Sequence, residues 1–118
     1  MAHDHPPSFV AVIVGAGPAG LMAAVALACH GHRILVAAAK PSFGRKFLMA
    51  GKSGLNLTKL EAQETFLTAF HDARKPLEPM LQRFEPHDVE IWAKTLGITL
   101  FTGSTGRVFP VEMKASPL

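Results

Sequence analysis

The stretch FVAVIVGAGPAGLMAAVALACHG, residues 9–31, constrains the fold more than any other part of this 118-residue chain. It contains no Asp, Glu, Lys or Arg and is long enough to cross a bilayer as a helix. Its first half, however, holds three glycines and a proline, and a spanning helix broken in this way leaves backbone groups without partners in lipid. The preceding residues also lack the basic region of a secretory signal. We therefore expect a cytoplasmic protein with no membrane partner.

An interpretation of this stretch as a strand, a turn and a helix explains every one of its residues. Residues 9–14 are rich in β-branched side chains and predict a buried parallel strand. Residues 21–31 are strong helix formers that end at a glycine, and residues 33–39 predict a second short strand. This order predicts the βαβ start of an α/β, Rossmann-like domain that binds FAD or NAD(P).

The turn between strand and helix has the pattern G-x-G-x-x-G at Gly15, Gly17 and Gly20. In a dinucleotide site the first glycine permits the tight turn and the second lets the backbone approach a pyrophosphate. The third lets helix and strand pack closely, and the helix N-terminus supplies N–H groups and a partial positive charge to the phosphates. The spacing therefore predicts a dinucleotide site.

One member of this pattern is absent. An Asp or Glu is expected at the end of the second strand, where it accepts hydrogen bonds from the adenosine ribose, and Ala38 occupies that place. No acid lies between Asp4 and Glu61. A charge-assisted hydrogen bond contributes about 1.5–3 kcal/mol, so we expect binding to be about ten- to a hundredfold weaker. Lys40 leaves open an alternative, a site for the 2′-phosphate of NADP.

Charge and composition restrict the partners. Residues 1–60 hold six Lys and Arg against one acid, whereas residues 61–118 hold six against eight. A pyrophosphate is the simplest partner for the basic half. No basic stripe with interleaved aromatic residues is present, so nucleic acid is not expected, and no His or Cys spacing predicts a metal site. Cys29 lies among Ala and Leu and is expected to be a small core residue.

Two longer motifs carry a family resemblance: FGRKFLMAGKSGLNLT at residues 43–58 and GITLFTGSTGRVFPVEMKASPL at residues 97–118. With VGAGPAGLMAA they make the chain resemble the aminoacetone-oxidase-like and bile-acid-inducible-reductase-like flavoproteins of the two-dinucleotide-binding-domain superfamily. The resemblance implies an oxidoreductase that uses FAD, with NAD(P)H as a candidate electron donor and a small-molecule substrate that is unknown. Those relatives are much longer, so we expect a truncated N-terminal portion that is inactive alone.

The resemblance also assigns cofactor-binding positions. The matched positions are Gly15, Ala16, Gly17, Pro18, Ala19 and Gly20 for the FAD pyrophosphate loop, Arg45 and Lys46 for a basic pair near the phosphates or ribityl chain, and Gly51, Gly54 and Asn56 for a turn near the flavin. Many relatives have GGGRCN where this chain has GKSGLN, so no role of that Arg–Cys pair transfers. Ala38 replaces the relatives' acid. No residue has motif support as a catalytic acid, base or nucleophile.

The remaining residues predict helices followed by a β-hairpin. Helical patterns cover residues 59–74, 76–84 and 87–97, with Thr58 and Glu61 as a capping box for the first. The segments ITLFTG and RVFPV predict a hairpin, in which Arg107 could face the flavin or remain at the surface.

We expect a disordered tail over residues 1–8 and one partial domain over residues 9–118. Two alternatives to FAD binding stay open: an NAD(P)-binding domain, and a non-catalytic or vestigial nucleotide-binding module.

Overall fold

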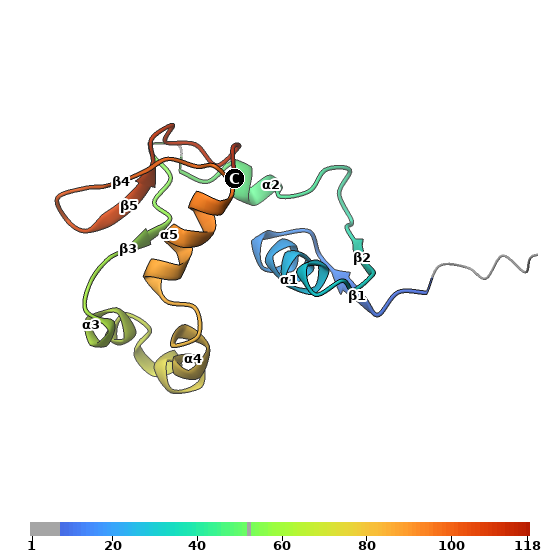
Figure 1. Cartoon of the computed structure of the whole chain (residues 1–118), viewed down its shortest axis with the longest axis horizontal. Coiled ribbons are helices and arrows are strands. Elements are labelled where there is room, and N and C mark those ends of the chain that lie inside the picture. Colours follow the sequence, from blue (N-terminus) through green and yellow to red (C-terminus); the bar gives the residue numbers. More distant parts are fainter. Residues whose placement is uncertain (1–7, 52) are drawn as a thin grey trace, which may run out of the picture. The chain divides into compact units, whose positions relative to one another are not determined.

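The computed structural model describes residues 8–51 and 53–118. The tail predicted for residues 1–8 therefore lies, apart from Ser8, outside the described residues. The chain forms two compact units, one ending at Met49 and the other running from Ala50 to Leu118. Figure 1 shows the elements of both units in chain order.

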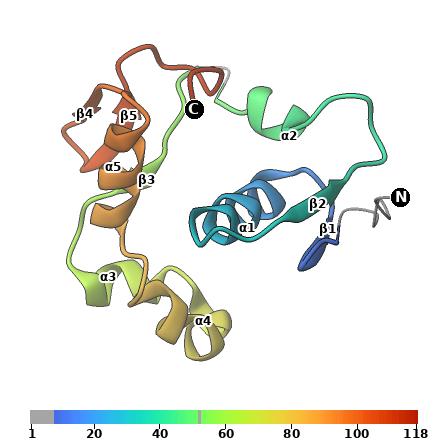
Figure 2. The ribbon, with the colours of Figure 1, turned by 45° about the vertical axis from the view of Figure 1, so that its right-hand side comes forward.

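The first unit is a βαβ unit, as the sequence predicted. Strand β1 (Ala11–Val14) leads into helix α1 (Pro18–Cys29), and strand β2 (Ile34–Ala37) returns beside β1 in parallel. The register pairs Ala11 with Ile34 at one end and Val14 with Ala37 at the other. The turn of helix α2 (Arg45–Leu48) closes the unit. Figures 1 and 2 both show α1 beside the two strands.

Burial alternates along both strands, because successive side chains point to opposite faces of a sheet. Ala11 and Ile13 are half-buried, whereas Val12 and Val14 are exposed. The prediction that Cys29 is a core residue is wrong, since its side chain is exposed. The better-covered residues of α1 recur every three positions and define the helix face that meets the sheet; they are Leu21, Ala24 and Leu27. Cys29 lies off that face.

The second unit combines short helices with an antiparallel sheet. Its three strands are ordered β3–β5–β4, and the hairpin of β4 and β5 confirms the prediction for residues 98–111. The elements are β3 (Thr58–Lys59), α3 (Gln63–Thr68), a 3₁₀ turn (His71–Ala73), α4 (Arg74–Leu81), α5 (Pro86–Thr95), β4 (Leu100–Thr102) and β5 (Arg107–Pro110). Helix α5 packs against β3 and β4.

The core of this unit is centred on strand β5. Val108 and Pro110 are completely buried, and Ala93 of α5 is buried with them. Phe109 points to the other face, where its ring stacks on Phe101 with centroids 5.5 Å apart. An offset pair of this kind adds about 0.5–1.5 kcal/mol beyond the area it buries. Side-chain packing on both faces therefore stabilises the hairpin.

The predicted capping box at Thr58 and Glu61 is wrong. Thr58 belongs to β3 and pairs with Val108, and helix α3 starts only at Gln63 without a side-chain cap. Pairing with the central strand satisfies backbone groups that a helix would otherwise have to use, so the tertiary contact overrides the local signal. The helix predicted for residues 59–74 is consequently shorter and continues through the 3₁₀ turn into α4.

A capping box does occur, at the start of α5. The Asp88 carboxylate accepts a hydrogen bond from the Glu85 backbone N–H at 2.7 Å, and Pro86 occupies the first helical turn. These features fix the start of the helix. Gly97, with φ of +77°, ends the segment as predicted.

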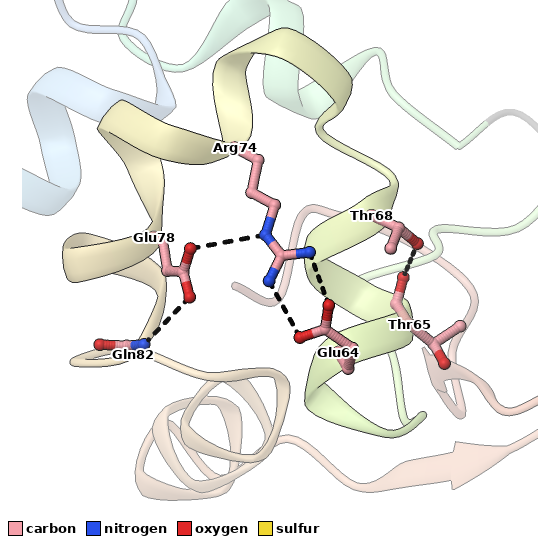
Figure 3. Close-up of polar contacts among 6 residues, drawn as sticks. All are labelled: Glu64, Thr65, Thr68, Arg74, Glu78 and Gln82. Atoms are coloured by element: carbon pink, nitrogen blue, oxygen red, sulfur yellow. Dashed lines mark hydrogen bonds and ion pairs between the residues drawn. The ribbon is translucent and has the colours of Figure 1, made fainter.

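Arg74 joins helices α3 and α4. Figure 3 shows its guanidinium between Glu64 and Glu78, with contacts of 2.6 and 2.9 Å to the two Glu64 oxygens and 3.4 Å to Glu78. The hydrogen bonds and charge of Arg74 lower the pKa of Glu64. This network orients two short helices that would be marginal in isolation.

Within residues 8–51 and 53–118, no helix combines the length and the apolar character needed to span a bilayer. The apolar stretch of residues 9–31 is instead divided between β1 and the 12-residue helix α1.

Candidate functional site

A pocket of about 300 Å³ opens in the first unit where β1 and β2 end. Ligands of open parallel α/β sheets bind beyond the carboxyl ends of the strands, so its position is the expected one. Three segments form its walls: the glycine-rich loop, the residues after β2 and the start of α2. The lining residues are Gly15, Ala16, Gly17, Pro18, Ala38, Ala39, Lys40, Ser42, Gly44, Arg45 and Lys46.

The glycine-rich loop has the backbone geometry that its sequence predicted. Gly15 has φ of +108°, a conformation that L-residues with a side chain rarely adopt, and its N–H donates to the Ala37 carbonyl at 2.8 Å. Gly17 is extended, and a Cβ added there would meet no atom within 4 Å. Because Gly17 lines the pocket, its missing side chain leaves the backbone open to a ligand. The cradle therefore fits a group that must come close to main-chain N–H donors.

Gly20 has a different role from Gly17. A Cβ there would overlap the carbonyl oxygen of Gly15 and would lie 3.3 Å from Cγ2 of Ile13. Gly20 and its neighbour Ala19 do not line the pocket. The third glycine thus lets α1 pack closely on the loop and strand, as the pattern predicted.

The N-terminus of α1 faces the same loop. Gly17 is its N-cap residue, Pro18 occupies the first turn, and no described side chain caps the helix. The first turn also contains no acid. The N–H groups of a first helical turn have no acceptor inside the helix, and the helix dipole adds partial positive charge there. This end of α1 is suited to an anion.

In the part of the chain that the structure describes, the cationic residues that line the pocket are Lys40, Arg45 and Lys46. The last two were predicted from the family resemblance, and the structure brings them to the glycine-rich loop. A hydrogen bond from the Gly44 N–H to the Ala16 carbonyl, 2.8 Å long, ties the two segments together. The cations and the helix N-terminus give the pocket positive charge, and no acidic residue is among the described residues that line it.

Sequence reasoning missed Gly44, which is buried and has φ of +63°. Its left-handed conformation turns the chain just before the basic pair, and a Cβ added there would lie 3.6 Å from Cδ1 of Leu21 in α1. The signal was present, since a glycine stands directly before Arg45 in FGRK. Ala39 and Ser42 were not predicted to line the pocket, because neither residue belongs to a recognisable ligand-binding motif.

Gly51, Gly54 and Asn56 belong to the second unit. Gly51 has φ of +66° and its carbonyl accepts from the Gly54 N–H at 2.9 Å, so both glycines shape a turn. A Cβ at Gly51 would lie 2.7 Å from the Leu55 nitrogen. The side chain of Asn56 is exposed. A turn requirement explains these glycines, and their role beside a flavin stays a prediction.

Arg107 starts strand β5, where it is exposed and pairs in register with Lys59. Its backbone carbonyl accepts the Gly103 N–H at 2.8 Å and closes the hairpin. Whether Arg107 faces the flavin, as the sequence left open, stays a prediction.

The lining residues that the structure describes can bind phosphate. Backbone donors, three cations and the Ser42 hydroxyl suit phosphate oxygens, and none of the lining residues in 8–51 and 53–118 carries a carboxylate, imidazole or thiol. Ala38 lies where the ribose-binding acid would be. The site thus fits the pyrophosphate of a dinucleotide and does not supply the usual acceptor for its ribose hydroxyls.

Comparison with protein families agrees with this geometry. The family model described as the HI0933-like protein Rossmann domain matches residues 9–118. The match includes the glycine-rich loop, the basic pair and the C-terminal hairpin, and it confirms the α/β Rossmann-type fold. The chain therefore belongs to the HI0933-like Rossmann-domain family, a FAD-binding family of the two-dinucleotide-binding superfamily.

Proposed function

We propose that the pocket of the first unit binds the ADP portion of FAD, and that the chain is the FAD-binding part of a cytoplasmic flavin-dependent oxidoreductase acting on a small molecule. One observation carries the proposal: the glycine-rich loop, the N-terminus of α1 and a basic pair all line one pocket of about 300 Å³. Family membership supports FAD among adenine dinucleotides.

The residues of the chain have distinct parts in this proposal. Gly15 and Gly17 let the backbone approach the pyrophosphate, and the first turn of α1 donates N–H groups to its oxygens. Arg45 and Lys46 neutralise the phosphate charge, and Gly44 positions both by its bond to the loop. When bound, FAD supplies hydride and electron transfer, with NAD(P)H as the proposed donor.

Within the family we propose the aminoacetone-oxidase-like group, on the strength of the motifs at residues 43–58 and 97–118. Gly51, Gly54 and Asn56 are proposed to lie near the flavin on the same ground. These residues form a conformationally constrained turn, which is compatible with a backbone surface held in place for a ligand.

The test is a titration of the chain with FAD, in which binding is measured by calorimetry and by the quenching of flavin fluorescence. An Arg45→Ala, Lys46→Ala double variant removes two charges from the pocket without touching its backbone. We expect it to lose at least tenfold in affinity, because each charge-assisted contact contributes about 1.5–3 kcal/mol. The matched control is Lys94→Ala, Lys75→Ala, which removes two exposed charges from α5 and α4.

The control is expected to bind FAD as the native chain does. Raising the salt concentration should weaken FAD binding by the native chain more than by the pocket variant, because fewer charge contacts remain to be screened. Absence of FAD binding by a folded native chain would overturn the proposal. Equal loss in both double variants would show that the phosphate contacts lie elsewhere.

A further inference from the structure

Met113 has a backbone conformation that a methionine rarely adopts. Its φ is +59°, in the left-handed region, where a side chain crowds the following carbonyl oxygen. It follows the end of β5, and its N–H donates to the Pro110 carbonyl at 2.9 Å. A residue keeps a costly conformation only where the surrounding structure fixes it, and such residues cluster at functional sites. The contacts of Met113 therefore indicate what its conformation serves.

Met113 contacts the turn that Gly51 and Gly54 shape. Its carbonyl accepts the Leu55 N–H at 3.2 Å. Its side chain fills the space where a side chain at residue 54 would project, because a Cβ added to Gly54 would overlap Cε of Met113 and would lie 3.6 Å from its Sδ. Phe109 of β5 borders the same space, with its Cδ1 3.9 Å from that position. Met113 thus meets the turn with both its backbone and its side chain.

These contacts anchor one side of the turn and leave Asn56 exposed beside it. Leu55 is buried, whereas the side chain of the next residue, Asn56, is exposed. Glycine is the most flexible residue, so a turn built on Gly51 and Gly54 needs contacts from other segments to keep one conformation. A surface that is already held in its bound form loses less conformational entropy when a ligand binds. The contacts of Met113 are of the kind that holds such a surface in place.

We propose that Met113 is a positioning residue, which holds the turn of Gly51, Gly54 and Asn56 in the conformation that contacts the flavin of FAD. The inference rests on the proposed function, from which it takes that this turn lies near the flavin. Met113 acts through its side chain, which occupies the open face of Gly54, and the unbranched thioether of methionine suits such an irregular space. The role requires no contact between Met113 and the flavin.

The test compares FAD with ADP, which contains the adenosine and pyrophosphate of FAD but lacks its ribityl chain and flavin. Calorimetry on the full chain gives both dissociation constants, and the ratio of ADP to FAD measures what the flavin end adds to binding. Met113→Ala empties the space over Gly54 and should lower this ratio about tenfold, with the affinity for ADP nearly unchanged. A factor of about this size corresponds to fixing the backbone of one residue that the native chain already holds in place.

Three further variants separate positioning from stability alone. Met113→Leu keeps a long apolar side chain over Gly54 and should restore most of the native ratio. Met113→Gly suits the positive φ better than alanine does, so it should unfold at a higher temperature than Met113→Ala and still show the lowered ratio. Ala93→Gly, at a buried position of α5, lowers the stability of the same unit and should leave the ratio as it is in the native chain.

The outcomes distinguish the positioning role from the proposed function. An unchanged ratio in Met113→Ala, shown to be folded by circular dichroism, would refute the positioning role and leave the dinucleotide pocket in place. An equal fall in Met113→Ala and Ala93→Gly would also refute it, because the ratio would then follow stability. If the native chain bound FAD no more tightly than ADP, the positioning role would fail while binding of the ADP portion stands. If the folded native chain bound neither ligand, both the positioning role and the proposed function would fail.

Discussion

The second and third glycines of the G-x-G-x-x-G loop, Gly17 and Gly20, lead to opposite predictions for the same substitution. A methyl group at Gly17 meets open space, whereas a methyl group at Gly20 overlaps the backbone of Gly15. Replacing each by alanine therefore separates the effect on the ligand from the effect on the fold. The comparison uses one chemical change at two positions only three residues apart.

Gly17→Ala should leave folding unchanged and weaken binding. The φ of −84° and ψ of −179° at this residue are accessible to alanine, and no atom within 4 Å would have to move. We expect the free energy of unfolding to change by less than about 0.5 kcal/mol. The added methyl group occupies the approach to the pocket, so at least one phosphate contact is lost. Affinity for FAD should fall about ten- to a hundredfold.

Gly20→Ala should destabilise the first unit. Its methyl group would overlap the Gly15 carbonyl oxygen, with the Gly15 carbonyl carbon at 3.2 Å and Ile13 Cγ2 at 3.3 Å. Overpacking costs about 1–3 kcal/mol, and a fixed backbone atom places this case at the upper end. Alanine recovers about 1 kcal/mol of helix propensity. The net loss is about 2 kcal/mol, or roughly 8 °C in melting temperature for a domain of this size.

The assay is thermal unfolding followed by circular dichroism, with and without FAD, on the native chain and both variants. Gly17→Ala should melt like the native chain but gain less from added FAD, because a weaker ligand stabilises less. Gly20→Ala should melt earlier in either condition. If Gly20→Ala left both melting and FAD binding unchanged, α1 would not pack on the loop as the structure shows. If Gly17→Ala destabilised the chain by about 2 kcal/mol, the conclusion that a methyl group at Gly17 meets no other atom would be wrong.

Three further predictions concern the second unit. Stability should fall on acidification below about pH 4.5, because the hydrogen bonds and charge of Arg74 lower the pKa of Glu64 from 4.5. The stabilisation from this ion pair is fully present above the pKa of Glu64 in the unfolded chain. It disappears as the pH falls through the lower pKa of Glu64 in the folded chain. In melting curves across this range, Glu64→Gln should remove that part of the pH dependence, and an unchanged profile would exclude the ion pair as its source. Asp88→Ala should cost about 1 kcal/mol in denaturant unfolding by removing the bond to the Glu85 N–H, and a loss below about 0.3 kcal/mol would contradict the capping role. Gly54→Ala should lower the free energy of unfolding by about 1–3 kcal/mol because φ of +140° is strained for alanine, whereas an unchanged midpoint would show that the turn adopts another conformation.

Much of the candidate site could be predicted from local sequence. The spacing of Gly15, Gly17 and Gly20 predicted a tight turn, an open backbone and a close helix contact, and the structure shows all three. The basic pair at Arg45 and Lys46 was predicted only through the family resemblance. The position of this pair in the pocket depends on the hydrogen bond from the Gly44 N–H to the Ala16 carbonyl, which joins residues 28 positions apart in the sequence. No periodicity in the sequence specifies that bond.

The errors also have physical causes. Thr58 and Glu61 have the spacing of a capping box, but Thr58 pairs with Val108, about fifty residues later, and a strand replaces the expected helix start. Cys29 has apolar neighbours in sequence, yet the direction of α1 places it away from the sheet. Both errors arise at residues whose environment depends on tertiary packing against another helix or strand.

By itself, the sequence determined the βαβ start, the conformation of the glycine-rich loop and the end of each helix that stops at a glycine. These features follow from φ and ψ preferences and from short-range periodicity, which act within a few residues. Only the tertiary structure decided that Lys40 and Ser42 share a pocket with the loop, and that β5 becomes the buried centre of the second unit. The physical reason is that hydrogen bonds and packing between distant segments select one of several locally allowed conformations, and local preferences are too weak to make that selection.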